Sequence, residues 1–105
     1  MNSGSIPKDR WCAELDAFSR DHEGWRVDVR VSTPGGATRT EAHGLPLVGV
    51  SCDTPGGSRV AVLTGERADD HLTHEIPDAV SIDIEESGVS IRAADGSRTE
   101  VAFKR

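Results

Sequence analysis

Hydrophobic residues recur with helical spacing near the start of the chain and with strand-like alternation over most of the remainder. Trp11, Leu15 and Phe18 lie four and three residues apart, a spacing that places their side chains on one face of a helix. Gly24 then supplies a residue that readily takes the left-handed conformation found after helix ends. The pattern predicts a single helix over residues 6–23, with an apolar face that must pack on a sheet.

Alternation of apolar and polar residues begins directly after this helix. Val27, Val29 and Val31 alternate with charged residues, the pattern of a strand with one buried and one solvent-facing side. Similar segments follow, separated by turns rich in proline and glycine, and two of these turns share the sequence Thr-Pro-Gly-Gly, at 33–36 and 54–57. The strands expected from this pattern cover residues 25–31, 37–43, 45–52, 59–63, 79–84, 89–93 and 98–103.

These segments differ in character. Residues 37–43 are polar and rich in threonine, which is typical of an exposed edge strand, whereas 45–52 and 59–63 carry apolar residues on both faces and are expected in the centre. The apolar phase slips beside Gly49, which indicates a β-bulge. The fold expected is α+β and a single domain, with a flexible N-terminus at 1–5, the helix at 6–23, and at 25–104 a twisted antiparallel sheet of six or seven strands that can curl into a half-barrel.

Length and composition limit the chain to one small domain. Its 105 residues leave no room for a second domain, and a hydrophobic content of 35% predicts a small, aliphatic core. No apolar run approaches the roughly 18 residues needed to cross a bilayer, and the N-terminus lacks the basic start and apolar stretch of a signal peptide. We therefore expect a cytoplasmic protein with no membrane partner. Cys12 and Cys52 form no Cys-x-x-Cys pair, which in a reducing compartment favours two free, largely buried thiols over a disulfide.

The net charge of −6 is concentrated in one part of the sequence. Residues 66–86 contain eight acidic residues and one basic residue, while the rest of the chain has ten acidic and eleven basic residues and is close to neutral. Because the chain has no cluster of basic residues, it is a poor candidate for binding nucleic acid. The acidic residues either present a negative face to a basic partner or form a solvated loop and outer sheet face. They are Glu66, Asp69, Asp70, Glu75, Asp78, Asp83, Glu85 and Glu86.

The stretch of residues 64–77 interrupts the alternation and holds the candidate site. Its candidate residues are Asp69, Asp70, His71, His74 and Glu75. Imidazole and carboxylate groups are ligands for zinc and iron, and on one turn of helix the spacing of the two histidines would place both rings on one face. On a strand the rings would point in opposite directions. Alternatively, the histidines bind loop backbone or face solvent, and the two aspartates cap a helical turn.

A complete metal site or catalytic site is not evident from these residues. A third metal ligand would have to come from one of the acids, from His43 or from Cys52, and no strong zinc spacing is present, so we predict no stoichiometric metal and no cofactor. The nearest hydroxyls, those of Thr64 and Thr73, lie in no recognisable triad. These residues leave open whether the chain is an enzyme.

Several short motifs occur together along the chain. They are Ile6-Pro7 followed by Trp11, Phe18-Ser19-Arg20 with His22 and Gly24-Trp25, Leu45-Pro46-Leu47 with Gly49, and the run from Asp69 to His74. In combination they resemble a bacterial family of unknown function, number five-three-three-five among the domains of unknown function. The resemblance covers nearly the whole chain. It implies a stand-alone bacterial domain of about this length, and it brings no assigned activity or catalytic residue.

Two functions are compatible with these observations. The first, which we favour, is a non-catalytic binding domain whose partner is a protein or a small molecule, bound through the acidic face or an unpaired strand edge. The second is a metal-dependent or histidine-based enzyme that uses residues 69–75. The oligomeric state and the identity of the ligand do not follow from the sequence.

Overall fold

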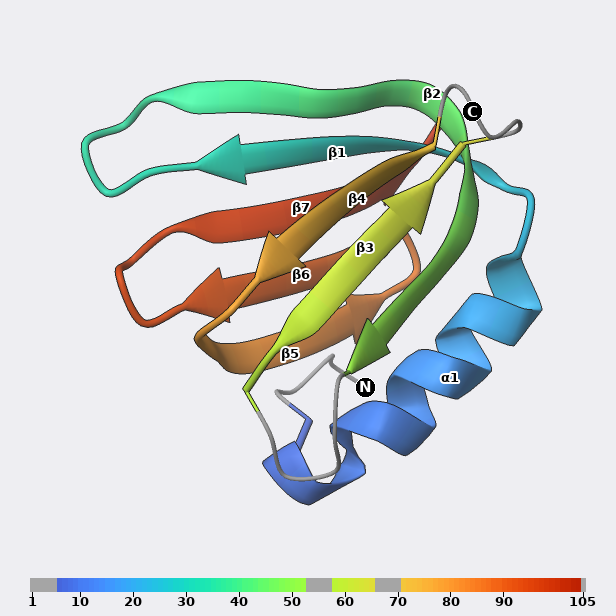
Figure 1. Ribbon diagram of the computed structural model, residues 1–105, viewed down its shortest axis with the longest axis horizontal. Helices are drawn as coiled ribbons and strands as arrows, with labels where there is room; N and C mark the ends of the chain where they lie inside the picture. The colour runs from blue at the N-terminus through green and yellow to red at the C-terminus, as the bar shows by residue number, and fades with distance from the viewer. Residues whose placement is uncertain (1–5, 53–57, 66–70, 105) are drawn as a thin grey trace.

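The computed structural model describes residues 6–52, 58–65 and 71–104. Within these residues, one helix lies against one side of a strongly curved antiparallel sheet (Figure 1). The strands are β1 (Arg26–Ser32), β2 (Thr38–Cys52), β3 (Val60–Thr64), β4 (Leu72–Ile76), β5 (Ala79–Glu85), β6 (Gly88–Ala93) and β7 (Arg98–Phe103). Their order across the sheet is β4-β3-β2-β1-β7-β6-β5, and the sheet stays open. The predicted α+β class is confirmed.

The N-terminal helix forms where the hydrophobic spacing predicts it. A short 3-10 turn, η1 (Lys8–Arg10), leads into the α-helix α1 (Trp11–His22). The buried residues of α1 are Trp11, Leu15 and Phe18, which is the face expected from their spacing. The helix ends before Gly24, whose φ of +88° is a left-handed conformation that glycine takes without strain.

The long strand β2 gives the sheet its shape. Segments expected as two strands, at 37–43 and 45–52, form one bent strand that changes partners along its length. The first half, up to Pro46, pairs with β1, and the second half, from Leu47, pairs with β3. A register shift between Leu47 and Gly49 confirms the bulge expected there. Residues 37–43 are therefore not a separate edge strand, although this half of β2 has one strand partner and is largely exposed.

The change of partner folds β3 and β4 over the inner face of the other strands (Figure 1). The core is enclosed by this face, by the folded strands β3 and β4, and by α1. Its members include Leu15, Phe18, Val27, Val29, Leu47, Val50, Val62, Ile82, Ile91 and Val101. Most of them are the inward residues of the alternating segments, so the strand pattern and the buried residues agree.

The two cysteines form a disulfide, which corrects the expectation of two free thiols. Cys12 lies in the first turn of α1 and Cys52 at the end of β2. Because α1 packs along β2, the Cα atoms of the two residues come within 5.3 Å, inside the normal range for a disulfide. The residues are 40 positions apart in the sequence, and that separation says nothing about their distance in the fold.

The stretch expected as an interruption of the sheet contains the strand β4. It pairs with β3 from Leu72, opposite Thr64, to Ile76, opposite Val60. The inward residues of β4 are Leu72, His74 and Ile76. Because the middle one is a histidine, the strand has no run of alternating apolar residues by which it could be recognised in the sequence. The structure has seven strands, as many as expected, because two errors cancel. The strand β4 was not predicted, and the segments 37–43 and 45–52 form the single strand β2.

Two further expectations concern turns and membranes. In the turn at 33–36, the N–H of Gly36 donates to the carbonyl of Thr33 at 2.9 Å, with φ +94° at Gly36. The second Thr-Pro-Gly-Gly turn, at 54–57, lies outside the described residues. In the described part of the chain, no helix has the length and apolar character needed to cross a membrane.

Candidate functional site

The fold separates the five candidate residues. Asp69 and Asp70 lie outside the described residues. His71 is exposed immediately before β4, His74 is half-buried within β4, and Glu75 is exposed. Because this part of the chain is extended, side chains three residues apart point to opposite faces, and the two imidazoles do not converge. Among the residues that the structure describes, no group of three or more His, Cys, Asp or Glu side chains is placed to hold a metal ion.

His74 faces the inside of the curved sheet. Its Nε2 atom lies 3.3 Å from Oγ1 of Thr99, a residue of β7 that is 3% exposed. Burial lowers the pKa of His74 below its ordinary value; the Glu41 carboxylate opposes this shift and the Arg39 guanidinium adds to it. The imidazole is therefore neutral at neutral pH, with one ring nitrogen as donor and the other as acceptor. His74 and Thr99 together provide a polar, uncharged surface inside the fold.

A cavity of about 190 Å³ lies beside His74, between β4 and the turn that joins β6 to β7. His74 points inward from β4 and Glu75 points outward, yet both residues line this cavity. A cavity that reaches both faces of a strand lies along its edge. Since β3 covers one edge of β4, the cavity lies along the other edge.

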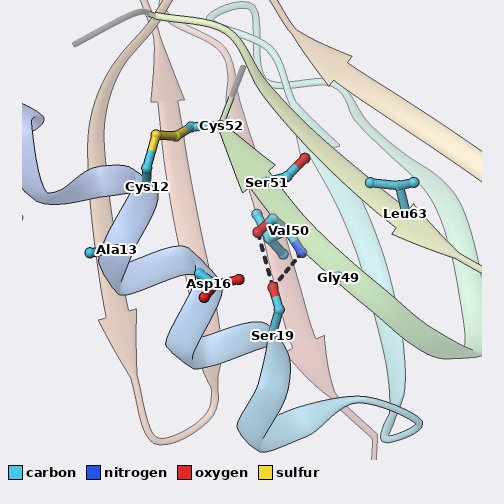
Figure 2. A pocket seen from close by; sticks show the side chains of 9 residues that line it. All are labelled: Cys12, Ala13, Asp16, Ser19, Gly49, Val50, Ser51, Cys52 and Leu63. Carbon is cyan, nitrogen blue, oxygen red and sulfur yellow. Dashed lines mark hydrogen bonds between the residues drawn. A yellow bond between two sulfur atoms is a disulfide. The ribbon is translucent and has the colours of Figure 1, made fainter. Parts of the chain in front are cut away.

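The direction of the backbone groups in β4 follows from a contact in β2. The N–H of Val50 donates to the hydroxyl of Ser19 at 2.8 Å, and the carbonyl of Val50 lies 3.0 Å from the same hydroxyl (Figure 2). Val50 therefore directs its backbone groups away from β3, so Val50 and Val62, which lie opposite each other, form a non-hydrogen-bonded pair. Val62 in turn directs its N–H and C=O groups toward β4.

Two residues of β4 direct their backbone groups to the open edge. Val62 lies opposite His74, so the N–H and C=O groups of His74 face β3. Thr73 and Glu75, on either side of His74, face the other way. No other strand pairs with β4, and within the described residues these outward backbone groups have no hydrogen-bond partner. The cavity therefore lies next to an open strand edge.

The charge around this edge is negative. Glu75 forms an ion pair with Arg59 at 3.0 Å. Asp95 accepts hydrogen bonds from the hydroxyl of Ser97 at 2.6 Å and from its N–H at 2.9 Å, and these bonds lower the pKa of Asp95. Asp78 is exposed at the turn after β4. All three acidic residues line the cavity, and the described residues of its lining include no Lys or Arg.

The other described acidic residues of the 66–86 stretch lie away from the cavity. Asp83 and Glu85 are on β5, Glu86 follows in the next turn, and Glu66 lies outside the described residues. Two acidic residues of the stretch line the cavity, together with one from the turn between β6 and β7. The negative charge at the site thus comes from two separate parts of the sequence.

A larger cavity, of about 510 Å³, lies between α1 and the second half of β2 (Figure 2). The Cys12–Cys52 disulfide and Ser19 both line it, the latter bound to the backbone of β2. Asp16, the carboxylate in its lining, is ion-paired with Arg20. The disulfide and Ser19 fasten α1 to the sheet, and Asp16, whose ion pair lies within α1, presents no unpaired charge to the cavity.

A polar cluster on the outer face of the sheet was not predicted. Asp28 is 7% exposed and accepts a hydrogen bond from the N–H of Gly44 at 2.8 Å. The same carboxylate lies 3.2 Å from Nδ1 of His43 and 3.4 Å from Arg30. Because Gly44 takes a φ of +65°, β2 bends over the carboxylate and buries it. His43, considered above as a metal ligand, is thus bound on the face of the sheet opposite to His74.

The residues that complete the cavity come from the C-terminal hairpin. Asp95 and Ser97 lie in its turn and Thr99 at the start of β7. Sequence reasoning missed their role, although one signal was available: Thr99 shares its strand parity with the inward residues Val101 and Phe103. A threonine at an inward position is a polar group directed into the fold.

The fold and the cavity define a small α+β domain with an open sheet edge beside a polar cavity. The chain matches the Family of unknown function (DUF5335) over residues 2–105, and it therefore belongs to this family. This match confirms the resemblance drawn from the short motifs. No curated protein and no solved structure matches the chain.

Proposed function

We propose that this chain is a non-catalytic binding domain and that its ligand, a protein or a small molecule, binds at the open edge of β4. One observation carries the proposal: the cavity beside His74 lies along a strand edge at which the backbone groups of Thr73 and Glu75 have no partner among the described residues. Ligand sites commonly combine apolar walls with a few convergent polar groups, and open strand edges bind partners through their backbone.

The surroundings of His74 support binding rather than catalysis. A histidine-based enzyme needs a reactive group within hydrogen-bonding reach of the imidazole and accessible to substrate. The hydroxyl that His74 reaches belongs to Thr99, which lines the cavity but is only 3% exposed. Thr64 is buried at the end of β3, and Thr73 lies on the face of β4 opposite to His74. An enzyme that uses residues 69–75 has less support from this geometry.

We further propose a bacterial, cytoplasmic location, which the family resemblance and the composition favour. The disulfide between Cys12 and Cys52 argues against the cytoplasm, because disulfides persist mainly in oxidising compartments. Alkylation of thiols in intact cells gives the test. A cytoplasmic protein should have both cysteines alkylated for much of its population, and complete protection of both would contradict the proposed location.

Screening a fragment library by amide NMR tests the proposed site. Fragments should shift the amides of residues that line the cavity beside β4, and a matched pair of variants provides the control. Ser97→Phe fills this cavity and should abolish the shifts, while Ser51→Phe fills the cavity beside α1 and should leave them unchanged. Fragments that bind beside α1 and are displaced by Ser51→Phe would contradict the proposed site.

A further inference from the structure

We infer that the partner at β4 is a polypeptide segment in an extended conformation, which adds to the sheet as a further strand and places a lysine or arginine side chain in the cavity. This inference rests on the proposed function and names the class of partner. Two features of the open edge lead to it: the direction of the backbone groups and the chemistry of the cavity walls.

The backbone of β4 is suited to pairing with another strand. Thr73 and Glu75 are alternate residues, so both direct an N–H and a C=O group to the same edge. A flexible small molecule would have to match this repeat by chance, whereas an extended peptide has the same repeat of donors and acceptors. Pro77 follows shortly after, and since it has no N–H, pairing ends there. The edge thus accepts a short segment.

The cavity is suited to a single long side chain. Its volume of about 190 Å³ is below the roughly 300–1,000 Å³ that is usual for drug-sized ligands. Its apolar wall consists of Val31, Ile76, Pro77 and Ala93. A side chain that enters from a strand paired with β4 would pass along this wall toward the carboxylates at its rim.

The charges of the cavity select a basic side chain. Lysine and arginine have an apolar stem and a charged end, which match an apolar wall with carboxylates at its rim. Glu75 is already paired with Arg59, but Asp78 has no ion-pair partner within the described residues, and Asp95 is held in its ionised form by Ser97. His74 is neutral and does not repel a cation. An acidic side chain would meet Glu75, Asp78 and Asp95 in the lining, and the nearby Arg59 is already paired with Glu75.

A second copy of this chain is a poor occupant of the edge. Pairing of two β4 strands would bring the acidic residues beside each edge together, and like charges on adjacent strands are destabilising. The open edge therefore favours a basic partner over a second copy of this chain. Its acidic character also protects the domain from self-association.

Selection of displayed peptides tests this inference. Random peptides of about nine residues, a length within the usual range for strands, are selected on the whole domain. Binding is then compared between Thr73→Pro, which removes an outward N–H without breaking a bond to β3, and Thr73→Val, which keeps that N–H. In Thr73→Pro the hydrogen bond from the N–H of residue 73 to the peptide is lost and the proline ring blocks the edge. Binding should therefore be at least tenfold weaker than in Thr73→Val.

The basic side chain is tested with the selected peptides. Replacing one lysine or arginine by norleucine should weaken binding about tenfold, and Asp95→Asn together with Asp78→Asn should remove the difference between the two peptides. Glu86 is an exposed acidic residue outside the cavity lining, so Glu86→Gln should leave the difference in affinity between the two peptides unchanged. Binding of the basic peptide should also weaken as salt increases.

The outcomes separate this inference from the proposed function. If binding is weakened by Thr73→Pro but not by norleucine, the requirement for a basic side chain is wrong and the binding site at the edge of β4 is retained. Fragments that bind the cavity while no peptide binds the edge would overturn the polypeptide partner and leave the proposed function standing. Peptides that bind Thr73→Pro and Thr73→Val equally, and shift amides beside α1, would overturn both.

Discussion

The two edge strands of the sheet, β5 and β4, differ in the hydrogen bonds that their outward backbone groups make. At β5, the N–H of Ile6 donates to the carbonyl of Ile82 at 2.9 Å, and the N–H of Ala79 donates to the carbonyl of Ser58 at 2.9 Å. At β4, the outward backbone groups of Thr73 and Glu75 have no such partner among the described residues. We call β5 the covered edge, because its own chain binds it at these two positions, and β4 the open edge.

The difference follows from the two sequences. β5 has seven residues with isoleucine at inward positions, and such a strand would associate with other chains if its edge were exposed. The segment that covers it is anchored, because the Nε1 atom of Trp11 donates to the carbonyl of Ile6 at 3.0 Å. β4 has five residues, its outward side chains are Thr73 and Glu75, and acidic groups surround it. A short, acidic edge can stay open without causing aggregation.

Both edge strands pack on the same core, so removing a large side chain from that core should have the largest effect on stability. Phe18 is 4% exposed and stacks on Phe103, with ring centroids 5.8 Å apart. Phe18→Ala is expected to lower the free energy of unfolding by about 3–5 kcal/mol, through lost burial and the cavity that forms. Denaturant unfolding measures this loss, with the exposed Asp21→Ala on the same helix as control. A loss within about 0.5 kcal/mol of the control would show that the edges do not share this core.

The covered edge should depend on the disulfide more than the open edge does. Cys12 lies just after the segment that carries Ile6, so its bond to Cys52 helps to hold this segment beside β5. Reduction is expected to cost about 2–4 kcal/mol, and the double variant Cys12→Ala, Cys52→Ala should lose a similar amount and no longer respond to reductant. Hydrogen exchange should increase more in β5 than in β4. An equal increase in both strands would contradict the role given to the covering segment.

Proline substitutions on the two edges sharpen the comparison. Ile6→Pro removes the N–H that binds Ile82 and should cost about 1 kcal/mol more than Ile6→Val, which keeps it. Thr73→Pro removes an N–H that has no partner within the described residues, so its cost relative to Thr73→Val should be smaller. Thermal unfolding of the four variants measures both differences. If Thr73→Pro proves the more costly proline, the edge of β4 is not open.

The smallest effect expected is a pH dependence at the open edge. Burial lowers the pKa of His74 in the folded state below its value of about 6.5 in the unfolded chain. The unfolded state therefore binds the proton more readily, so stability is retained above pH 6.5 and is lost as the pH falls through the folded-state pKa. In His74→Gln this part of the pH dependence should disappear. NMR titration that finds a pKa above 6.5 for His74 would show that the ring is not desolvated.

Local patterns were sufficient to predict most of the fold. The spacing of Trp11, Leu15 and Phe18 and the glycine after the helix define α1, and period-two alternation defines the strands that have one clean apolar face. The errors share a physical cause. The joining of two segments into β2 and the disulfide both depend on which parts of the chain become neighbours, and β4 is recognisable mainly by its pairing with β3. Such long-range pairing leaves little trace in local alternation.

The site was predictable to a smaller extent. The sequence singled out residues 69–75, and the structure places His74 and Glu75 from that stretch in one cavity. The expectation of a helical turn there is replaced by a strand, which separates His71 from His74. Thr99 and Asp95 come from a hairpin more than twenty residues further along, so their contact with β4 follows from the folding of the sheet over itself.

Hydrogen exchange of individual amides in β4 tests the open edge most directly. Because the N–H groups of Thr73 and Glu75 face away from β3 and that of His74 faces toward it, protection should alternate along the strand. Thr73 and Glu75 should exchange rapidly, while His74 should be protected to nearly the extent of the amides that bind β2 to β3. Strong protection of all three amides would show that both edges of β4 are occupied, and would contradict the open edge on which the proposed function rests.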